Sequence, residues 1–367
     1  MSAPRVGLVL GAGGIMGGAW LTGALDAITT ESGWDPGTAE FIVGTSAGSM
    51  MAALLAGGVP PWFMVAHSAG RSFDGLVGED GRPAAEADRA AGAEFKLQRA
   101  LPPIGPGSLR LAARTLATPW RYTPATVGVG WLPRGVVSTE PLKDIVRRVT
   151  PTGWSDHPNL WVMACDYATG ERVAFGRAGA PRVELTEAVA ASCAIPAFYY
   201  PVEIGGRRYI DGGIRSTSNL DVLRGLDLDM VICLNPTSSR HPPRAWNPAE
   251  VVGARMNRDS GKRLGSEAKA LRAEGTDVIL IQPQPADLEA MGPNLMARRG
   301  RNRVIATAKA TTAAQLHAGG IRELLKELPA GTPYMVREPD VPPEDWSALR
   351  ADARAARFGR PGASQTS

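Results

Sequence analysis

A serine lies between two glycines in the segment GTSAG at residues 44–48, directly after the apolar run of residues 41–43. Glycine, serine and threonine are the usual residues of turns, so an ordinary turn explains the segment. The spacing of Gly44, Ser46 and Gly48 is also typical of a nucleophile elbow, a tight strand-to-helix turn that holds a reactive hydroxyl exposed. The five residues alone do not decide between a turn and a nucleophile, because short motifs have many chance matches.

A second glycine-rich turn, GAGGIMGG at residues 11–18, follows the apolar run of residues 5–10. It begins like the dinucleotide-binding pattern Gly-x-Gly-x-x-Gly, but Met16 stands at the third glycine position. No acidic residue ends the second expected strand to bind ribose hydroxyls, so a dinucleotide site is the weaker alternative. The N–H groups of such a turn can instead stabilise an oxyanion at the positive end of a helix dipole. Beside a serine nucleophile, an oxyanion hole indicates acyl-transfer chemistry.

A serine nucleophile needs a positioned base, and two kinds of residue could supply it. In a Ser-His-Asp hydrolase the base would be a histidine late in the chain, here His241 or His317. The first lies in a proline-rich loop and the second in a helical run, so both are typical of surface histidines. The other candidate is Asp211, which ends a short strand before Gly212 and Gly213. An Asp-Gly hairpin turn explains these residues equally well, so the spacing leaves the base open.

The elements that must position these residues alternate between short buried strands and helices. The apolar runs at residues 5–10 and 41–43 each precede a glycine-rich turn and a helical pattern. This order indicates an α/β fold with a mainly parallel central sheet between helices, in which both turns face each other at one sheet edge. The remaining sheet is expected from a hairpin at residues 160–175 and from strands within residues 207–213, 229–235 and 276–282, and residues 303–328 are expected to be helical.

Residues 60–150 have a different composition and are expected to form a helical or irregular insert that is rich in Pro, Gly and Ala. Between Glu94 and Glu140 the chain has no acidic residue, whereas basic residues stand at Lys96, Arg99, Arg110, Arg114, Arg121 and Arg134. Within it, the segment SLRLAARTLA predicts a short helix whose stripe of Leu109, Ala112, Ala113 and Leu116 has Arg110 and Arg114 beside it. An ordinary surface helix explains this pattern, and the alternative is a lid or a segment that contacts an anionic membrane surface.

The overall composition excludes several classes of protein. The chain has 367 residues, and 44% of them are hydrophobic. Its net charge is +4 and its pI is near 9.1, but it has no compact basic stripe with interleaved aromatic residues. No nucleic-acid partner is therefore expected. Three widely spaced cysteines and four histidines without ligand spacing predict neither a disulfide framework nor a metal site, and no cofactor is expected. The lack of a signal-peptide pattern and of a long apolar run favours a cytoplasmic protein, with peripheral membrane contact as an alternative.

Three segments in this order resemble the patatin-like phospholipase family: LVLGAGGIMGGAWLTGAL, GTSAGS and ASCAIPAFYYPVEIGGRRYIDGG. The resemblance is close over residues 6–57 and 161–236 and weaker elsewhere. It implies a three-layer α/β hydrolase fold and a serine esterase or lipid acyl hydrolase that acts on phospholipids or other acyl lipids. By position it implies Ser46 as the nucleophile and Asp211 as the base of a dyad without histidine. The same comparison implies an oxyanion hole at Gly13 and Gly14 and an elbow that depends on Gly44 and Gly48.

The chain departs from the family pattern at Met16, where the glycine loop of the family usually has Arg or Lys. This departure implies that backbone amides and the helix dipole alone stabilise the oxyanion. It also leaves open a catalytically weak or inactive relative that binds lipid. Residues 1–330 are expected to form the hydrolase domain, with residues 60–150 as the insert and residues 95–139 as a candidate lid. Residues 331–367 are expected to form an extended or disordered tail.

Overall fold

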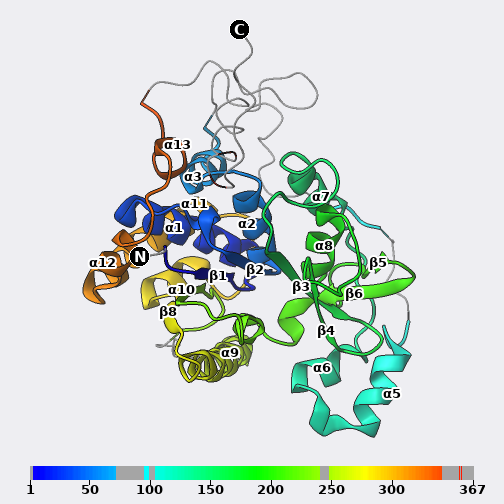
Figure 1. Cartoon of the computed structure of the whole chain (residues 1–367). Coiled ribbons are helices and arrows are strands. Elements are labelled where there is room, and N and C mark those ends of the chain that lie inside the picture. Colours follow the sequence, from blue (N-terminus) through cyan, green and yellow to red (C-terminus); the bar gives the residue numbers. More distant parts are fainter. Residues whose placement is uncertain are drawn as a thin grey trace.

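The computed structural model describes residues 3–71, 95–98, 104–239 and 248–340, with Ala355 and Arg357. The described strands form one mixed sheet with the order β5–β6–β3–β2–β1–β7–β8, and β4 pairs with β3 beside this path (Figure 1). The strands are β1 (Val6–Leu10), β2 (Phe41–Thr45), β3 (Leu160–Asp166), β4 (Arg172–Phe175), β5 (Val202–Ile204), β6 (Arg207–Asp211), β7 (Met230–Leu234) and β8 (Asp277–Ile281).

The sheet is parallel through its centre and antiparallel at one edge. Strands β3, β2, β1, β7 and β8 run parallel, whereas β4, β6 and β5 are joined by antiparallel pairs. The central strands are buried on both faces, which is why their sequences are nearly continuous apolar runs. The expected mainly parallel central sheet is therefore confirmed, and each strand expected from the sequence is present.

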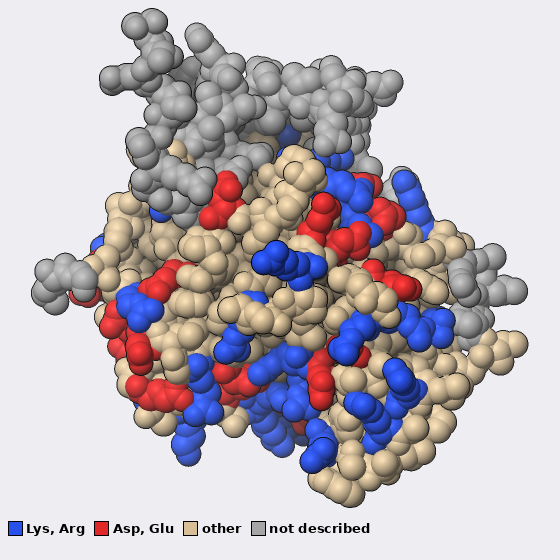
Figure 2. All heavy atoms as spheres, turned by 45° about the vertical axis from the view of Figure 1, so that its right-hand side comes forward, with Lys and Arg blue, Asp and Glu red and all other residues tan. Residues whose placement is uncertain are grey.

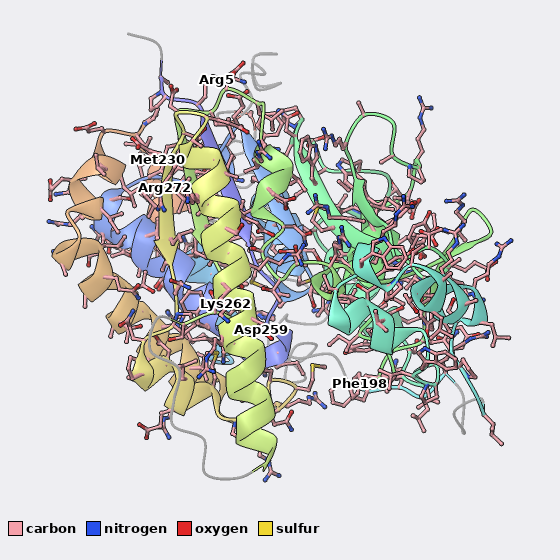
Figure 3. All side chains as sticks on the ribbon, turned by 90° about the horizontal axis from the view of Figure 1, so that it is seen from below. Arg5, Phe198, Met230, Asp259, Lys262 and Arg272 are labelled. Carbon is pink, nitrogen blue, oxygen red and sulfur yellow. The ribbon has the colours of Figure 1, made fainter. Side chains whose placement is uncertain are left out.

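Helices cover both faces of the sheet and make three layers. One face packs against α1 (Gly14–Ser32), α2 (Ala47–Ala56), α8 (Leu185–Ser192), α10 (Pro285–Met291) and α11 (Arg301–Ala318). The other face packs against α9 (Pro248–Arg272) and the 3₁₀ turn η4 (Leu220–Leu223). Side chains of β1 alternate between these cores, since Leu8 and Leu10 lie in the first and Val9 in the second. Figure 3 shows α9 lying along the second face of the sheet, with Asp259, Lys262 and Arg272 labelled on the helix. The Arg272 end of α9 lies near Met230, the first residue of β7.

Two helical expectations need correction. The run at residues 303–328 is not one helix, because α11 ends before Gly319 and Gly320, and α12 (Ile321–Lys326) follows. Gly320 has a φ of 65°, a conformation that ends an α-helix and that glycine adopts without strain. The 25-residue helix α9 was absent from the sequence expectations, since its glycines weaken the helical pattern and its stability depends on packing against the sheet.

The insert is helical in its described part. It contains α3 (Pro61–Ser68), α5 (Leu109–Ala117), the 3₁₀ turn η2 (Pro119–Arg121), α6 (Pro124–Val129) and α7 (Glu140–Arg147). Residues 72–94 and 99–103 of the expected insert lie outside the described residues. The helix expected over SLRLAARTLA is present as α5, but its expected apolar stripe does not share one environment: Ala112 is buried, whereas Leu109 and Leu116 are 71% and 65% exposed.

The chain beyond residue 330 is packed where it is described. Helix α13 (Pro333–Val336) lies against α3, where the Tyr334 ring is edge-on to the Trp62 ring with the centroids 5.8 Å apart. Arg357 forms a buried ion pair with Asp35 of the first α/β unit. The domain boundary at residue 330 stays a prediction, and the structure adds that packed contacts continue past it.

Candidate active site

The turn between β2 and α2 holds Ser46 in an unusual backbone conformation. Ser46 has a φ of 53° and a ψ of −123°, a region that residues with a side chain rarely adopt. Such strain persists only where the surroundings impose it, and it is characteristic of nucleophile elbows. The residue lies at the N-cap of α2, makes no side-chain capping bond and is 3% exposed.

Gly44 and Gly48 make this turn sterically feasible. A Cβ atom on Gly44 would lie 2.5 Å from the Ser49 Cα, and one on Gly48 would lie 2.0 Å from the Leu10 carbonyl oxygen. Both distances are far inside van der Waals contact, so any side chain would push α2 away from β1 and β2. The two glycines therefore allow α2 to approach the sheet closely and keep Ser46 at the carboxyl end of β2.

Asp211 ends β6 and lies one strand away from Ser46. In the sheet, Asp211 pairs with Ala164 of β3, and the adjacent Met163 pairs with Thr45 of β2. Strand β6 runs antiparallel to β3, so its last residue reaches the part of the sheet at which β2 ends. The Ser46 side chain acts on the Asp211 carboxylate and lowers its pKa, as a hydrogen-bond donor does. Two residues 165 positions apart are thereby brought close together.

The surroundings of Asp211 change its acidity. The side chain is 5% exposed, and burial raises its pKa from 3.8 to about 6, because the charged carboxylate loses its hydration. Two hydrogen bonds oppose this shift, one from Ser46 and one from the Gly213 N–H to Oδ1 at 2.7 Å. A carboxylate with a pKa near 6 is a better proton acceptor than an ordinary aspartate and is still ionised at neutral pH.

The glycine-rich loop after β1 lies beside both residues. A Cβ atom on Gly213 would lie 3.2 Å from the Ala12 Cβ, so this loop touches the segment that follows Asp211. Gly13 is the N-cap of α1, and Gly14 begins that helix with a φ of 61°. Within the described part of the chain, the N–H groups of Gly13 and Gly14 have no hydrogen-bond acceptor. Two amide donors at a helix N-terminus are what an oxyanion hole requires.

Glycine is needed at both positions of this loop. A Cβ atom on Gly13 would lie 2.6 Å from the Gly17 Cα and from the Pro236 side chain. On Gly14 it would lie 2.9 Å from the Leu295 carbonyl oxygen, and the positive φ adds strain. The loop between α10 and α11 therefore closes over the start of α1, where the Met16 N–H donates to the Leu295 carbonyl at 2.9 Å.

The Met16 side chain does not point into open solvent beside this loop. It is 3% exposed and belongs to the apolar core on the α1 face of the sheet. The position that resembles a basic position in the family thus has a packing role in this chain.

The structure adds two serines that the sequence reasoning did not single out. Ser192, the last residue of α8, accepts a hydrogen bond from the Ser46 N–H at 2.8 Å and donates to the Met163 carbonyl at 2.6 Å. Ser49 donates to the Ser46 carbonyl at 2.6 Å. These bonds hold the backbone of the elbow from both sides. Ser192 lies in the segment ASCAIP, which the family resemblance included without giving this residue a role.

Of the two histidines considered as an alternative base, the described one, His317, lies away from Ser46 and Asp211. His317 is in the last turn of α11, where its Nε2 lies 2.9 Å from the Glu31 carboxylate. Glu31 is near the end of α1, about 25 Å along the helix from Gly14 at 1.5 Å per residue. His241 lies outside the described residues.

Other features of the described residues lie apart from this site. An open hollow of about 500 Å³ beside α9 is lined by Ser239, Arg258, Gly261, Lys262, Leu264, Gly265, Leu280 and Gln282. Neither Ser46 nor Asp211 lines it. In the described ranges, no group of three or more His, Cys, Asp or Glu side chains is arranged as a metal site. No helix within the described chain combines the length and apolar character that a bilayer crossing requires.

Comparison with known proteins agrees with this geometry. The family model for patatin-like phospholipases matches residues 8–224, which include the glycine loop, the elbow and Asp211. Uncharacterized NTE family proteins of Mycobacterium bovis and Mycobacterium tuberculosis are 29% identical over 259 residues. The matched region covers 70% of this chain but only 56% of each mycobacterial protein, so the chain spans little more than half of their length. Because the family model covers more than half of the chain, this protein belongs to the patatin-like phospholipase family.

Proposed function

We propose that the protein is a serine esterase or lipid acyl hydrolase that cleaves carboxylic esters of phospholipids or other acyl lipids. The observation that carries this proposal is the juxtaposition of the strained Ser46 with the buried carboxylate of Asp211, whose pKa the Ser46 side chain lowers. A glycine loop with two amide donors lies beside this pair, which is the third component that acyl transfer needs.

In the acylation step, Asp211 accepts the proton of the Ser46 hydroxyl while the serine oxygen attacks the ester carbonyl carbon. The carbonyl oxygen becomes an oxyanion, and the N–H groups of Gly13 and Gly14 donate to it. Collapse of this intermediate breaks the ester C–O bond. The alcohol leaves with the proton that Asp211 received, and the acyl group stays on Ser46.

Deacylation repeats the sequence with water as the nucleophile. Asp211 accepts a proton from water, the resulting hydroxide attacks the acyl carbonyl, and the glycine loop again stabilises the oxyanion. The Ser46 oxygen then leaves and recovers the proton from Asp211, so the free acid and the starting enzyme are formed. The same carboxylate thus acts as base and acid in both half-reactions, and no histidine is required.

The test is hydrolysis of a series of p-nitrophenyl esters of increasing chain length by wild type, Ser46→Ala and Asp211→Asn. Both substitutions are expected to lower kcat/KM by about 1,000-fold or more while circular dichroism shows a folded protein. His317→Ala is the matched control, because its imidazole is bound to Glu31 at the surface, and its activity should equal that of wild type. A fluorophosphonate probe should add its mass to the peptide that contains Ser46.

Two results would contradict the proposal in different ways. Loss of turnover in His317→Ala or His241→Ala would indicate a Ser-His-Asp mechanism in place of the dyad. A folded wild type that binds lipid but neither hydrolyses any ester nor reacts with the probe would indicate a lipid-binding relative. Met16 is the residue that favours this second candidate, because it places an apolar side chain where the family usually has a cation.

A further inference from the structure

The exposed apolar side chains of this protein are concentrated in one segment. Among the described residues, nine large hydrophobic side chains are exposed, and eight of them lie within residues 95–132. The ninth is Leu324 of α12. Scattered exposed leucines need no explanation, but a concentration of this kind marks an interaction site. The most exposed positions in or beside α5 are Leu109 at 71%, Leu116 at 65% and Trp120 at 78%.

The opposite side of α5 already has a packing partner within the protein. Leu111 packs with Val129 of α6 against Cys165, Tyr167 and Ile210 of the sheet, and these residues form a separate small core. The lobe formed by residues 104–132 is thereby attached to the sheet through one face of α5. The exposed side chains of the outward face take no part in this core, so their apolar character requires another explanation.

The outward face of α5 has two parallel rows of different character. At 100° per residue, Leu109, Ala113 and Leu116 fall on one flank, and Arg110 and Arg114 fall on the adjacent flank. Apolar side chains with arginines beside them are the pattern of helices that lie in a membrane interface. The apolar row enters the boundary between head groups and acyl chains, and the guanidinium groups stay at the level of the phosphates.

Tryptophans extend this face at both ends of the helix. Trp120 lies in the 3₁₀ turn directly after α5, and Trp131 is 48% exposed. The Gly107 N–H donates to the Leu132 carbonyl at 2.8 Å, which places residues 131–132 beside the start of α5. Tryptophan is enriched at membrane interfaces because its ring is apolar and its N–H remains hydrogen-bonded to water or head groups.

The charge of the lobe is of one sign. Residues 95–139 contain six basic residues and no acidic residue. Helices α5 and α6 lie at the lower right of Figure 1 and come to the lower right of Figure 2. In that part of Figure 2, basic side chains lie among uncharged ones without acidic neighbours. Each basic residue near an anionic bilayer contributes about 1 kcal/mol of attraction, or about a 5-fold gain in binding. An anionic surface therefore fits this lobe better than a neutral one.

The lobe is also bonded to the segment that carries the dyad base. The Thr123 hydroxyl donates to the Ile214 carbonyl at 3.2 Å, and Ile214 ends the 3₁₀ turn η3 (Gly212–Ile214) directly after Asp211. We propose that the protein docks on anionic phospholipid bilayers through the outward face of residues 109–132. The apolar contacts of this face are Leu109, Leu116, Trp120 and Trp131, and its charges are Arg110, Arg114 and Arg121. Docking through this face brings a bilayer next to the loop that positions Asp211.

The test is flotation of the full chain with vesicles of phosphatidylcholine alone or mixed with phosphatidylglycerol. Wild type should float with the anionic vesicles and much less with the neutral ones. Leu109→Gln with Leu116→Gln should abolish flotation, and Arg110→Gln with Arg114→Gln should weaken anionic binding by about 25-fold, which is 5-fold for each arginine. The matched controls are Leu324→Gln for an exposed leucine and Arg182→Gln for an exposed arginine elsewhere, and both should bind like wild type.

A second readout locates the contact. Brominated phospholipids should quench the tryptophan fluorescence of wild type, and Trp120→Phe should reduce this quenching while it retains binding, since phenylalanine keeps an apolar ring. Equal flotation of wild type and the double leucine variant would overturn the proposal. It would also be overturned if light scattering showed a dimer that the double leucine variant dissociates, because the face would then be covered by a second copy of the chain.

The docking inference does not depend on turnover, and the two can fail separately. The lobe variants should hydrolyse soluble p-nitrophenyl esters at the rate of wild type, because none of their residues belongs to the dyad, the elbow or the glycine loop. Hydrolysis of phospholipid in anionic vesicles should fall in the same variants in proportion to lost binding. Flotation without any ester hydrolysis would refute the proposed function and leave the docking face intact.

Discussion

The hydroxyl of Ser192 accepts a hydrogen bond from the backbone N–H of Ser46 at 2.8 Å, although 146 positions separate the two residues. Ser192 in turn donates to the Met163 carbonyl, so α8, β3 and the elbow are joined through one side chain. The elbow is strained, and this bond is one of the contacts that hold it in place. The position of the proposed nucleophile therefore depends on a residue that has no role in the proposed chemistry.

Ser192→Ala removes this support without touching the dyad. The Ser46 N–H loses its buried acceptor, which should lower the free energy of unfolding by about 1–3 kcal/mol. Displacement of the nucleophile should lower kcat by about 100-fold with little change in KM. Steady-state kinetics and urea unfolding measure both effects. A loss of stability without a loss of kcat would mean that Ser192 supports the fold and not the position of Ser46.

The activity should depend on pH through Asp211. The base must be ionised to accept a proton, and burial raises its pKa to about 6. We expect kcat/KM to rise tenfold per pH unit below about pH 6 and to level off above it. The initial rates of wild type over a series of buffers give this profile. A plateau that extends down to pH 4 would show that the carboxylate titrates as an ordinary aspartate and that burial does not tune it.

The same pKa shift should destabilise the folded protein at neutral pH. Between pH 3.8 and about 6 the folded state holds a proton that the unfolded state has lost, so stability falls as pH rises through this window and stays reduced above it. Asp211→Asn, which has no charge to bury, should therefore melt at a higher temperature than wild type at pH 7. This difference should shrink at pH 4, and a gain of equal size at both pH values would contradict the assignment.

Gly48→Ala tests the close approach of α2 to the sheet. The added Cβ would overlap the Leu10 carbonyl oxygen, and the backbone shift should cost about 3 kcal/mol and most of the activity. Gly18→Ala is the matched control on α1, because its Cβ would meet only the Ala47 Cβ at an ordinary 3.7 Å. That change should stabilise α1 by about 0.5–1 kcal/mol. Thermal unfolding of both variants distinguishes steric exclusion from a general intolerance of alanine.

Arg357 should stabilise the domain from the far end of the chain. Its guanidinium pairs with both carboxylate oxygens of Asp35 at 2.6 Å, and both side chains are almost fully buried. Arg357→Met leaves a buried carboxylate unpaired and should lower the free energy of unfolding by about 3–5 kcal/mol. Arg337→Met, which breaks the exposed pair with Asp340, should change it by less than about 1 kcal/mol. Similar effects in both variants would show that the Asp35 pair is not buried in solution.

The sequence by itself was enough to predict the glycine turns, the candidate dyad and every described strand except the three-residue β5. Buried parallel strands are recognisable as short apolar runs. Turns that need positive φ or close backbone approach need glycine, so the sequence alone indicates the turns at Gly14, Gly44 and Gly48. The order of the motifs then indicated the family, which the comparison confirmed. The roles of Ser46 and Asp211 stay predictions that the kinetics above can test.

Only the tertiary structure decided what supports the dyad and what the insert exposes. Ser192 could not be found from its sequence neighbours, because its partners Ser46 and Met163 are far away in the sequence and the bonds follow from how α8 packs. The stripe of α5 was mispredicted for the same reason. Periodicity shows that a helix has an apolar side, but the residues beneath it determine which side is buried. Here Leu111 packs against Cys165, Tyr167 and Ile210 of the sheet, so Leu109 and Leu116 remain at the surface.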